Sequence, residues 1–236
     1  MKRRRRTITL ILAPVIALLT AVGYTASTAQ AAVWESCDQW GNWTSPEGYI
    51  VYNNIWGSGA GSQCISAESG QEFTVSADHP NTGGIKSYPN SKYIVGQPIN
   101  AIDSFTTSYD VTVPQSGAYN TAYDIWDENY DHEIMLWLNW YGPVGPLGSQ
   151  VGTAELGGHT WDIYNGSNGA NNVYSFLRQG NSSQGEIDVV PVLDYIVDQG
   201  WMSESTVIGD SQLGFEITSS AGGLDFTVNN YAVSAN

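Results

Sequence analysis

Short segments with the two-residue period of β-strands recur along most of this chain of 236 residues. Apolar side chains alternate with polar ones in these segments, and Gly, Asn, Pro and Ser separate each segment from the next. The predicted strands cover residues 49–55, 72–77, 104–113, 121–126, 133–140, 159–164, 172–179, 212–218 and 224–232. Many short strands with turn residues between them are typical of an all-β sandwich or jelly roll.

One segment, residues 188–201, breaks this two-residue period. Its apolar residues fall at helical spacing between Val190 and Trp201. Asp188 is available as the N-cap, and Gly200 lies near the end. The sequence therefore predicts one α-helix on a β scaffold.

The first 31 residues have the pattern of a secretory signal peptide. A basic block at residues 2–6 precedes an apolar stretch, and Ala29-Gln30-Ala31 offers a small-residue cleavage site. A membrane anchor is the alternative, and the arginine run also suits twin-arginine export, but the apolar stretch is short and small residues follow it. We expect residues 32–236 to form a single secreted, extracellular domain that is soluble and monomeric.

The charge of the chain argues against nucleic acid as a partner. Lys and Arg number 8 against 23 Asp and Glu, and five of those eight lie in the predicted signal peptide. Binding to phosphates needs clustered Lys and Arg, which the rest of the chain lacks. No later run is long or apolar enough to span a bilayer, so we expect no membrane contact after signal cleavage.

The chain has two cysteines, Cys37 and Cys64, which a secreted protein is expected to join in one structural disulfide. The three histidines, His79, His132 and His159, are isolated and show no metal-ligand spacing. We therefore expect no metal site, and we place each histidine on the surface or in a loop.

One predicted strand carries a carboxylate on the face that points away from the core. In residues 132–138, Glu133, Met135 and Trp137 share one face of the sheet, and the other face is purely apolar. A carboxylate beside an indole suits a cleft that binds sugars, because aromatic rings stack on the apolar faces of pyranose rings. The alternative is an exposed glutamate beside two large residues with no shared role.

Two further acids occupy comparable positions. Phe215 and Ile217 point to the core face of their strand, which leaves Glu216 on the other face. Asp124 also alternates with core-type neighbours and is placed to hydrogen-bond a catalytic carboxylate. Glycoside hydrolysis uses such a pair of carboxyls, because one attacks or activates water while the other protonates the departing oxygen. The alternative is that these acids are surface residues of unrelated strands.

Tryptophans concentrate near the start of the predicted mature chain, at Trp34, Trp40, Trp43 and Trp56. Any single one of them is expected to serve packing, because a small β domain buries its large apolar side chains. Asn54 and Trp56 alternate onto one face and are the better candidates for a ligand-binding pair.

A series of motifs then runs through almost the whole mature chain in a fixed order. They are Cys37-Asp38-Gln39-Trp40, Asn53-Asn54-Ile55-Trp56-Gly57, Tyr123-Asp124-Ile125-Trp126, Glu133-Ile134-Met135-Leu136-Trp137-Leu138, Gly145-Pro146-Leu147-Gly148, Asn172-Val173-Tyr174-Ser175-Phe176 and Gly214-Phe215-Glu216. In this order and spacing they resemble glycoside hydrolase family 12, the secreted endo-β-1,4-glucanases, in its bacterial type. The resemblance implies a jelly-roll β-sandwich of two curved antiparallel sheets with one α-helix and an open substrate cleft.

The resemblance also implies roles for single residues. Glu133 would be the nucleophile and Glu216 the general acid/base of a retaining mechanism, with Asp124 supporting Glu133 by a hydrogen bond. The positions that match sugar-binding residues are Trp40, Asn54, Trp56, Met135 and Pro146, with Trp40 the most distal. Cys37 and Cys64 match the family's N-terminal disulfide. The implied partner is a β-glucan polysaccharide, and no cofactor is expected.

Several alternatives stay open on sequence grounds. A xyloglucan-specific endoglucanase of the same family has the same motifs, since the choice of glucan depends on loop shapes. A family 11 xylanase shares the architecture, but its nucleophile strand is rich in Tyr. A non-catalytic carbohydrate-binding module or lectin also presents Trp and Asn on a β-sandwich, yet it leaves the pairing of Glu133 with Glu216 unexplained, as does a purely structural cell-surface domain.

Overall fold

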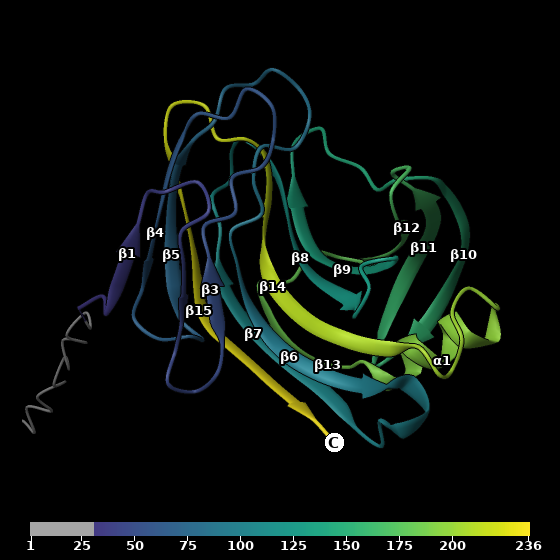
Figure 1. Cartoon of the computed structure of the whole chain (residues 1–236). Helices are drawn as coiled ribbons and strands as arrows, with labels where there is room; N and C mark the ends of the chain where they lie inside the picture. Colours follow the sequence, from purple (N-terminus) through teal and green to yellow (C-terminus); the bar gives the residue numbers. More distant parts are fainter. Residues whose placement is uncertain (1–30) are drawn as a thin grey trace, which may run out of the picture. The chain divides into compact units, whose positions relative to one another are not determined.

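Two β-sheets packed face to face make up residues 31–236, the part of the chain that this computed structural model describes (Figure 1). The first sheet contains, in spatial order, β1 (Trp34–Ser36), β4 (Ser62–Ala67), β5 (Phe73–Asp78), β15 (Leu224–Ala235), β7 (Phe105–Thr112) and β13 (Gln184–Asp188). The second contains β10 (Ser149–Leu156), β11 (His159–Ser167), β12 (Asn172–Arg178), β9 (His132–Tyr141), β8 (Ala118–Asp127), β14 (Val207–Ser219), β6 (Asn90–Pro98), β3 (Ile50–Tyr52) and β2 (Asn42–Thr44). A short 3-10 helix, Ile99–Ala101, and one α-helix, α1 (Val190–Asp198), complete the described residues. The predicted all-β sandwich with one α-helix is confirmed.

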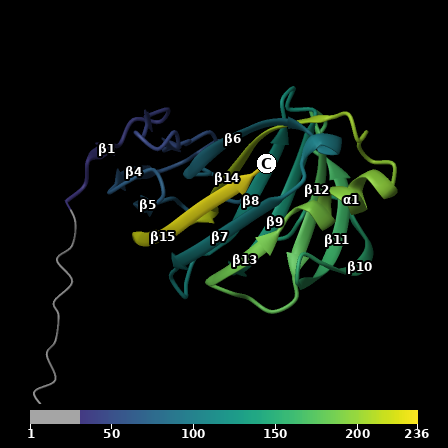
Figure 2. The same cartoon turned by 90° about the horizontal axis from the view of Figure 1, so that it is seen from below.

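Each sheet contributes one apolar face to the core between them. On β9, Ile134, Leu136 and Leu138 are fully buried, as the alternation predicts. On β14, Phe215 and Ile217 are buried in the same cluster. The nine-stranded sheet curves strongly, which Figure 1 and the view from below in Figure 2 both show. The remaining side chains of β9 and β14 therefore lie on the face of this sheet that is turned away from the core.

Neighbouring strands in both sheets are antiparallel apart from β9 and β12, which run parallel. In this parallel pair Asn172 lies opposite His132, and Val173 lies opposite Glu133. The starts of the two strands therefore meet at the same end of the sheet. This pairing brings the turn before β12 next to the turn before β9.

The helix is shorter than predicted. Asp188 is the last residue of β13, where it lies opposite Thr106, and the N-cap position belongs to Val189. Asp188 still assists the helix start, since its Oδ1 accepts the backbone N–H of Val190 at 3.2 Å. Gly200 has a φ of 69°, a left-handed conformation that favours glycine and ends the helix there.

The sequence patterns missed six strands, namely β1, β2, β4, β6, β10 and β13. β10 shows the physical reason, because it is the end strand of its sheet and most of its side chains are exposed or half-buried. An edge strand without a buried face has no need for apolar alternation. Four of the six missed strands, β1, β2, β10 and β13, are end strands, whereas β4 and β6 lie inside their sheets.

His79 lies in the loop after β5, one of the two places predicted for it, but it is not at the surface. Its side chain is fully buried and lies in a network of polar groups. Nδ1 accepts the backbone N–H of Gly61 at 3.0 Å, and Nε2 lies 2.9 Å from Oε1 of Gln63. Burial lowers the pKa of His79, so the ring is stable here as a neutral hydrogen-bonding group. His132 and His159 are half-buried and lie in β9 and β11 rather than in loops.

Cys37 and Cys64 form a disulfide that closes a loop over a sequence separation of 27 residues. We expect the double variant Cys37→Ser/Cys64→Ser to lose about 3 kcal/mol of unfolding free energy, because the bond restricts the unfolded chain. Urea denaturation followed by tryptophan fluorescence measures the difference. The wild-type protein treated with a thiol reductant serves as the matched control, and an unchanged urea midpoint in both samples would contradict the prediction.

The predicted signal peptide, residues 1–31, lies outside the described residues except for Ala31. Among the described residues, no helix reaches the length and hydropathy that a membrane span requires.

Candidate active site

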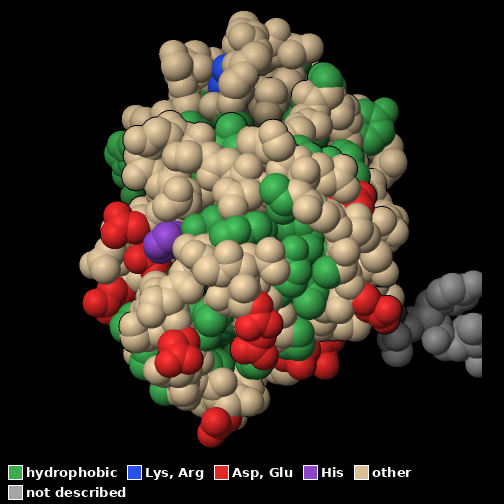
Figure 3. Space-filling view, turned by 90° about the vertical axis from the view of Figure 1, so that its right-hand side faces the viewer, with side chains coloured by type: hydrophobic (Ala, Val, Ile, Leu, Met, Phe, Trp, Pro, Cys, Tyr) green, Lys and Arg blue, Asp and Glu red, His purple; other side chains and the backbone are tan. Residues whose placement is uncertain are grey.

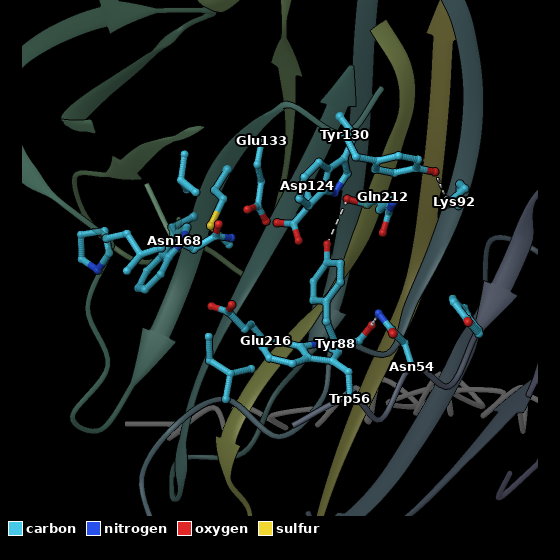
Figure 4. A pocket seen from close by; sticks show the side chains of 18 of the residues that line it. Asn54, Trp56, Tyr88, Lys92, Asp124, Tyr130, Glu133, Asn168, Gln212 and Glu216 are labelled. Atoms are coloured by element: carbon cyan, nitrogen blue, oxygen red, sulfur yellow. Dashed lines mark hydrogen bonds between the residues drawn. The ribbon is translucent and has the colours of Figure 1, made fainter. Parts of the chain in front are cut away.

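The face of the nine-stranded sheet that is turned away from the core holds a cleft of about 700 Å³. Seven residues predicted from the sequence line it: Asn54, Trp56, Asp124, Glu133, Met135, Pro146 and Glu216. Figure 4 shows the three acids, which come from different strands, turned into the same cavity. Because the sheet is curved, the side chains that the alternation predicts on its outer face lie together in one cleft.

The surface colours show how the apolar and charged side chains are distributed. On the face in Figure 3, hydrophobic side chains gather in a band across the middle, and most acidic side chains lie around and below it. Lys and Arg are nearly absent from this face. This face is therefore an acidic surface interrupted by apolar patches.

Glu133 enters the cleft from β9, between Trp126 on β8 and Val173 on β12. Its Oε2 accepts a hydrogen bond from Nδ2 of Asn171 at 3.2 Å. Burial and the negative charge of Glu216 raise the pKa of Glu133 to about 7, while the bond from Asn171 acts in the opposite direction. Near neutral pH, Glu133 is therefore present both as the ionised carboxylate and as the protonated acid.

Glu216 enters from β14, opposite Asn120 on β8. Nδ2 of Asn120 donates a hydrogen bond of 2.6 Å to Oε2 of Glu216. Burial raises the pKa of Glu216 to about 7, and the bond from Asn120 counteracts part of this rise. A carboxyl with such a pKa can hold a proton at mildly acidic pH and release it in a reaction.

Asp124 lies on β8 between the other two acids, with Gln212 and Met135 opposite it on the flanking strands. Its side chain is buried, and its Oδ1 has no hydrogen-bond partner within residues 31–236. Burial and the charges of Glu133, Glu216 and Asp210 raise the pKa of Asp124 well above its usual value. Within residues 31–236, Asp124 does not make the predicted hydrogen bond to Glu133. Oε2 of Glu133 accepts a hydrogen bond from Asn171 instead.

The predicted sugar-binding residues differ in their positions. Trp56 is 48% exposed at the cleft, and Asn54 is held beside it by a 3.1 Å hydrogen bond from its Nδ2 to the carbonyl of Tyr88. Trp40 does not line the cleft. Its ring lies 6.4 Å from that of Tyr52, which does line it. Trp40 therefore lies beyond the cleft, where its role as a distal platform stays a prediction.

Sequence reasoning missed a polar cluster on one wall of the cleft. Nζ of Lys92 lies 3.1 Å from Oδ2 of Asp210, and Gln212 donates from Nε2 to Oδ1 of the same aspartate at 2.8 Å. The hydroxyl of Tyr130 donates to Oδ2 of Asp210 at 3.4 Å. A register shift between Ile208 and Asp210 interrupts the pairing of β14 with both of its neighbours at this point.

Among residues 31–236, His, Cys, Asp and Glu side chains nowhere form a group of three or more placed to hold a metal ion. The chemistry that the site offers is that of carboxyl groups. A pair of half-buried carboxyls with raised pKa values, in a cleft with an exposed indole, can transfer a proton and attack a carbon centre. These features are typical of glycoside hydrolases as a class.

Comparisons with known proteins agree with this class and narrow it. The sequence profile of "Glycosyl hydrolase family 12" matches residues 47–236. The xyloglucan-specific endo-beta-1,4-glucanase A of Emericella nidulans is 32% identical over 232 residues, which cover 89% of this chain and 96% of that protein. The xyloglucanase domain of NopAA from Sinorhizobium fredii, solved in complex with cellobiose, is 35% identical with a TM-score of 0.81, over 87% of this chain and all of that one. Endoglucanase 3 of Trichoderma harzianum is 29% identical with a TM-score of 0.79, over 89% of this chain and 100% of that one. The chain belongs to glycosyl hydrolase family 12.

Proposed function

We propose that this protein cleaves β-1,4-glucosidic bonds inside glucan chains with retention of anomeric configuration. The observation that carries the proposal is the joint placement of Glu133 and Glu216 in one cleft, each half-buried and each with a pKa raised to about 7. Repulsion between two buried negative charges favours the state with one ionised and one protonated carboxyl. A retaining glycosidase starts its reaction from that state.

In the proposed reaction, the ionised Glu133 attacks the anomeric carbon and forms a glycosyl-enzyme. Glu216 gives its proton to the glycosidic oxygen as the bond to the leaving sugar breaks. Glu216, now ionised, then takes a proton from water, which attacks the same carbon and releases Glu133. Burial and the neighbouring carboxylates raise the pKa of Asp124 well above its usual value, which favours its protonated form, and a protonated carboxyl has an O–H that can donate to a neighbouring carboxylate.

We assign substrate binding to four side chains that line the cleft and to one beyond it. Trp56 offers a face on which a glucose ring can stack, and Asn54 offers polar atoms beside it. Met135 and Pro146 add apolar contacts. Trp40, beyond the cleft, would meet sugars further along the chain. We also propose that residues 32–236 are the mature, monomeric enzyme, which is exported after cleavage of residues 1–31.

A second candidate substrate is xyloglucan. The E. nidulans relative is named as xyloglucan-specific, and the S. fredii structure is that of a xyloglucanase domain. Cellulose, mixed-linkage β-glucan and xyloglucan share the β-1,4-glucan segments that the proposed reaction needs, so the same pair of acids serves all three.

The experiment measures new reducing ends after incubation of residues 32–236 with carboxymethylcellulose, barley β-glucan, xyloglucan and xylan. We expect release from the glucans and little from xylan, with a rapid fall in viscosity because cleavage is internal. Proton NMR of the first products should show the β-anomer, as retention requires. Binding to all four polysaccharides without cleavage would replace the proposal with a carbohydrate-binding module.

A further inference from the structure

The turn before β12 carries a side chain that donates a hydrogen bond to Glu133 and has no part in the proposed reaction. β11 ends at Ser167 and β12 begins at Asn172, so four residues connect them. β12 runs parallel to β9, and Val173 lies opposite Glu133. The last residue of the turn, Asn171, is thereby placed at the end of β9 from which Glu133 projects.

The turn is braced by its own side chains. Oδ1 of Asn168 accepts the backbone N–H groups of Ala170 at 2.9 Å and Asn171 at 3.0 Å. Oγ of Ser167 donates to the carbonyl of Asn171 at 2.8 Å and accepts the N–H of Gly169 at 3.0 Å. Gly169 has a φ of 90°, which other residues adopt only with strain. These bonds fix the backbone that carries the Asn171 side chain.

The same turn also fixes which end of the Asn171 amide faces the cleft. Nδ2 of Asn168 donates a 2.6 Å hydrogen bond to Oδ1 of Asn171. The oxygen is therefore occupied, and the nitrogen must point elsewhere. Its two hydrogens go to Oε2 of Glu133 at 3.2 Å and to the carbonyl of Asn172 at 3.3 Å. Only 8% of Asn171 is exposed, so water competes little for these bonds.

We infer that Asn171 is a positioning residue for the nucleophile: it holds Oε2 of Glu133 through a preset amide and leaves Oε1 to attack the anomeric carbon. This inference rests on the proposed function, since it takes Glu133 as the nucleophile. A donor fixed in advance stabilises the carboxylate over the carboxylic acid and removes rotation about the last side-chain bond. The other titratable or charged groups of the cavity are Tyr52, Tyr88, Lys92, Asp124, Tyr130 and Glu216.

The test replaces Asn171 by Ala and measures the pH dependence of kcat/KM on an aryl β-cellobioside. Without the donor the pKa of Glu133 rises, so the acidic limb of the profile should move to higher pH. We expect kcat/KM at the optimum to fall about 10-fold to 100-fold, because this is the usual effect of losing one hydrogen bond to a charged group. The rate at which a 2-deoxy-2-fluoro-β-cellobioside with a good leaving group inactivates the enzyme should fall in parallel, because it reports the attack by Glu133 alone.

Two further variants make the outcome decisive. Asn168→Ala leaves the Asn171 amide in place but frees it to rotate, so it should give a smaller shift in the same direction and carries the test if Asn171→Ala does not fold. Asn172→Ala is the matched control, because Asn172 is the adjacent, exposed asparagine and should leave the profile unchanged. A wild-type acidic limb in both Asn171→Ala and Asn168→Ala would overturn the inference.

Glu133→Gln, assayed beside them, separates this inference from the proposed function. An active Glu133→Gln would remove the nucleophile assignment itself. An inactive Glu133→Gln together with an unchanged Asn171→Ala profile would remove only the role of Asn171. A stability loss in Asn171→Ala without any shift of the acidic limb would assign Asn171 to turn structure alone.

Discussion

Glu133→Gln is expected to lower kcat/KM on β-glucan by about 10⁴-fold or more, because an amide cannot form the glycosyl-enzyme. Gln has the size of Glu, and its amide oxygen can still accept the hydrogen bond that Asn171 donates to Oε2 of Glu133. The substitution also removes one of two half-buried carboxyls with raised pKa values, which relieves repulsion in the cleft. The free energy of unfolding should therefore stay the same or rise.

Two measurements check this prediction together. Reducing-end assays give the activity, and urea denaturation gives the stability of the same preparation. Binding of cello-oligosaccharides should persist, since Trp56 and Asn54 are unchanged. Activity within 10-fold of the wild type, in a variant with wild-type stability, would assign the nucleophile to another group.

Period-2 alternation was sufficient to predict much of the site, because the site lies on the strands of one sheet. It separated Glu133 from the buried Ile134 and Glu216 from the buried Phe215. The same reasoning would also have reached Gln212 and Asn120, which lie four residues from Glu216 and from Asp124 on the same strand faces. Neither residue is an acid or an aromatic ring, and neither falls in the motifs of the family resemblance, so the sequence did not set them apart.

Other site residues have no local sequence signal. Tyr88 precedes β6, and its hydroxyl donates to the carbonyls of Ala122 and Gln212 at 3.1 and 3.2 Å. Its place depends on how β8 and β14 pair, which is a long-range property. Asn171 is similar, since its contact with Glu133 follows from the parallel register of β9 and β12. A pattern read along the chain does not contain such register information.

In the fold, too, features with a local sequence signal were easier to predict than features that depend on distant parts of the chain. Most strands inside the sheets have one face in the core, and their alternation made them predictable, whereas the exposed edge strand β10 was missed, as were the interior strands β4 and β6. The burial of His79 in its loop was not predicted, because isolated polar residues are usually exposed. Its burial depends on two partners that are distant along the chain, Gln63 and Ser220. Oε1 of Gln63 lies 2.9 Å from Nε2 of His79, and Oγ of Ser220 accepts the backbone N–H of His79 at 2.9 Å.

Glu216→Gln is expected to lower kcat/KM on β-glucan by about 10²-fold to 10⁴-fold, the usual contribution of a general acid. The effect should depend on the leaving group, which distinguishes this role from that of the nucleophile. An aryl cellobioside with an acidic phenol needs no proton to depart, so glycosyl-enzyme formation should be nearly normal. Water attack should then be slow, because no base remains, and added azide should restore turnover by forming a β-glycosyl azide.

The pH profile supplies an independent check on Glu216. In the wild-type enzyme the acid must be protonated, so kcat/KM is present at low pH and is lost as the pH rises through the pKa of Glu216, about 7. The nucleophile must be ionised, so activity is also lost as the pH falls through the pKa of Glu133, again about 7. In Glu216→Gln on the aryl substrate the loss at high pH should disappear, while the loss at low pH remains. A variant that keeps the loss at high pH, or that azide does not rescue, would mean that another group of the cleft is the acid, and Asp124 would be the next residue to replace because its pKa is also raised.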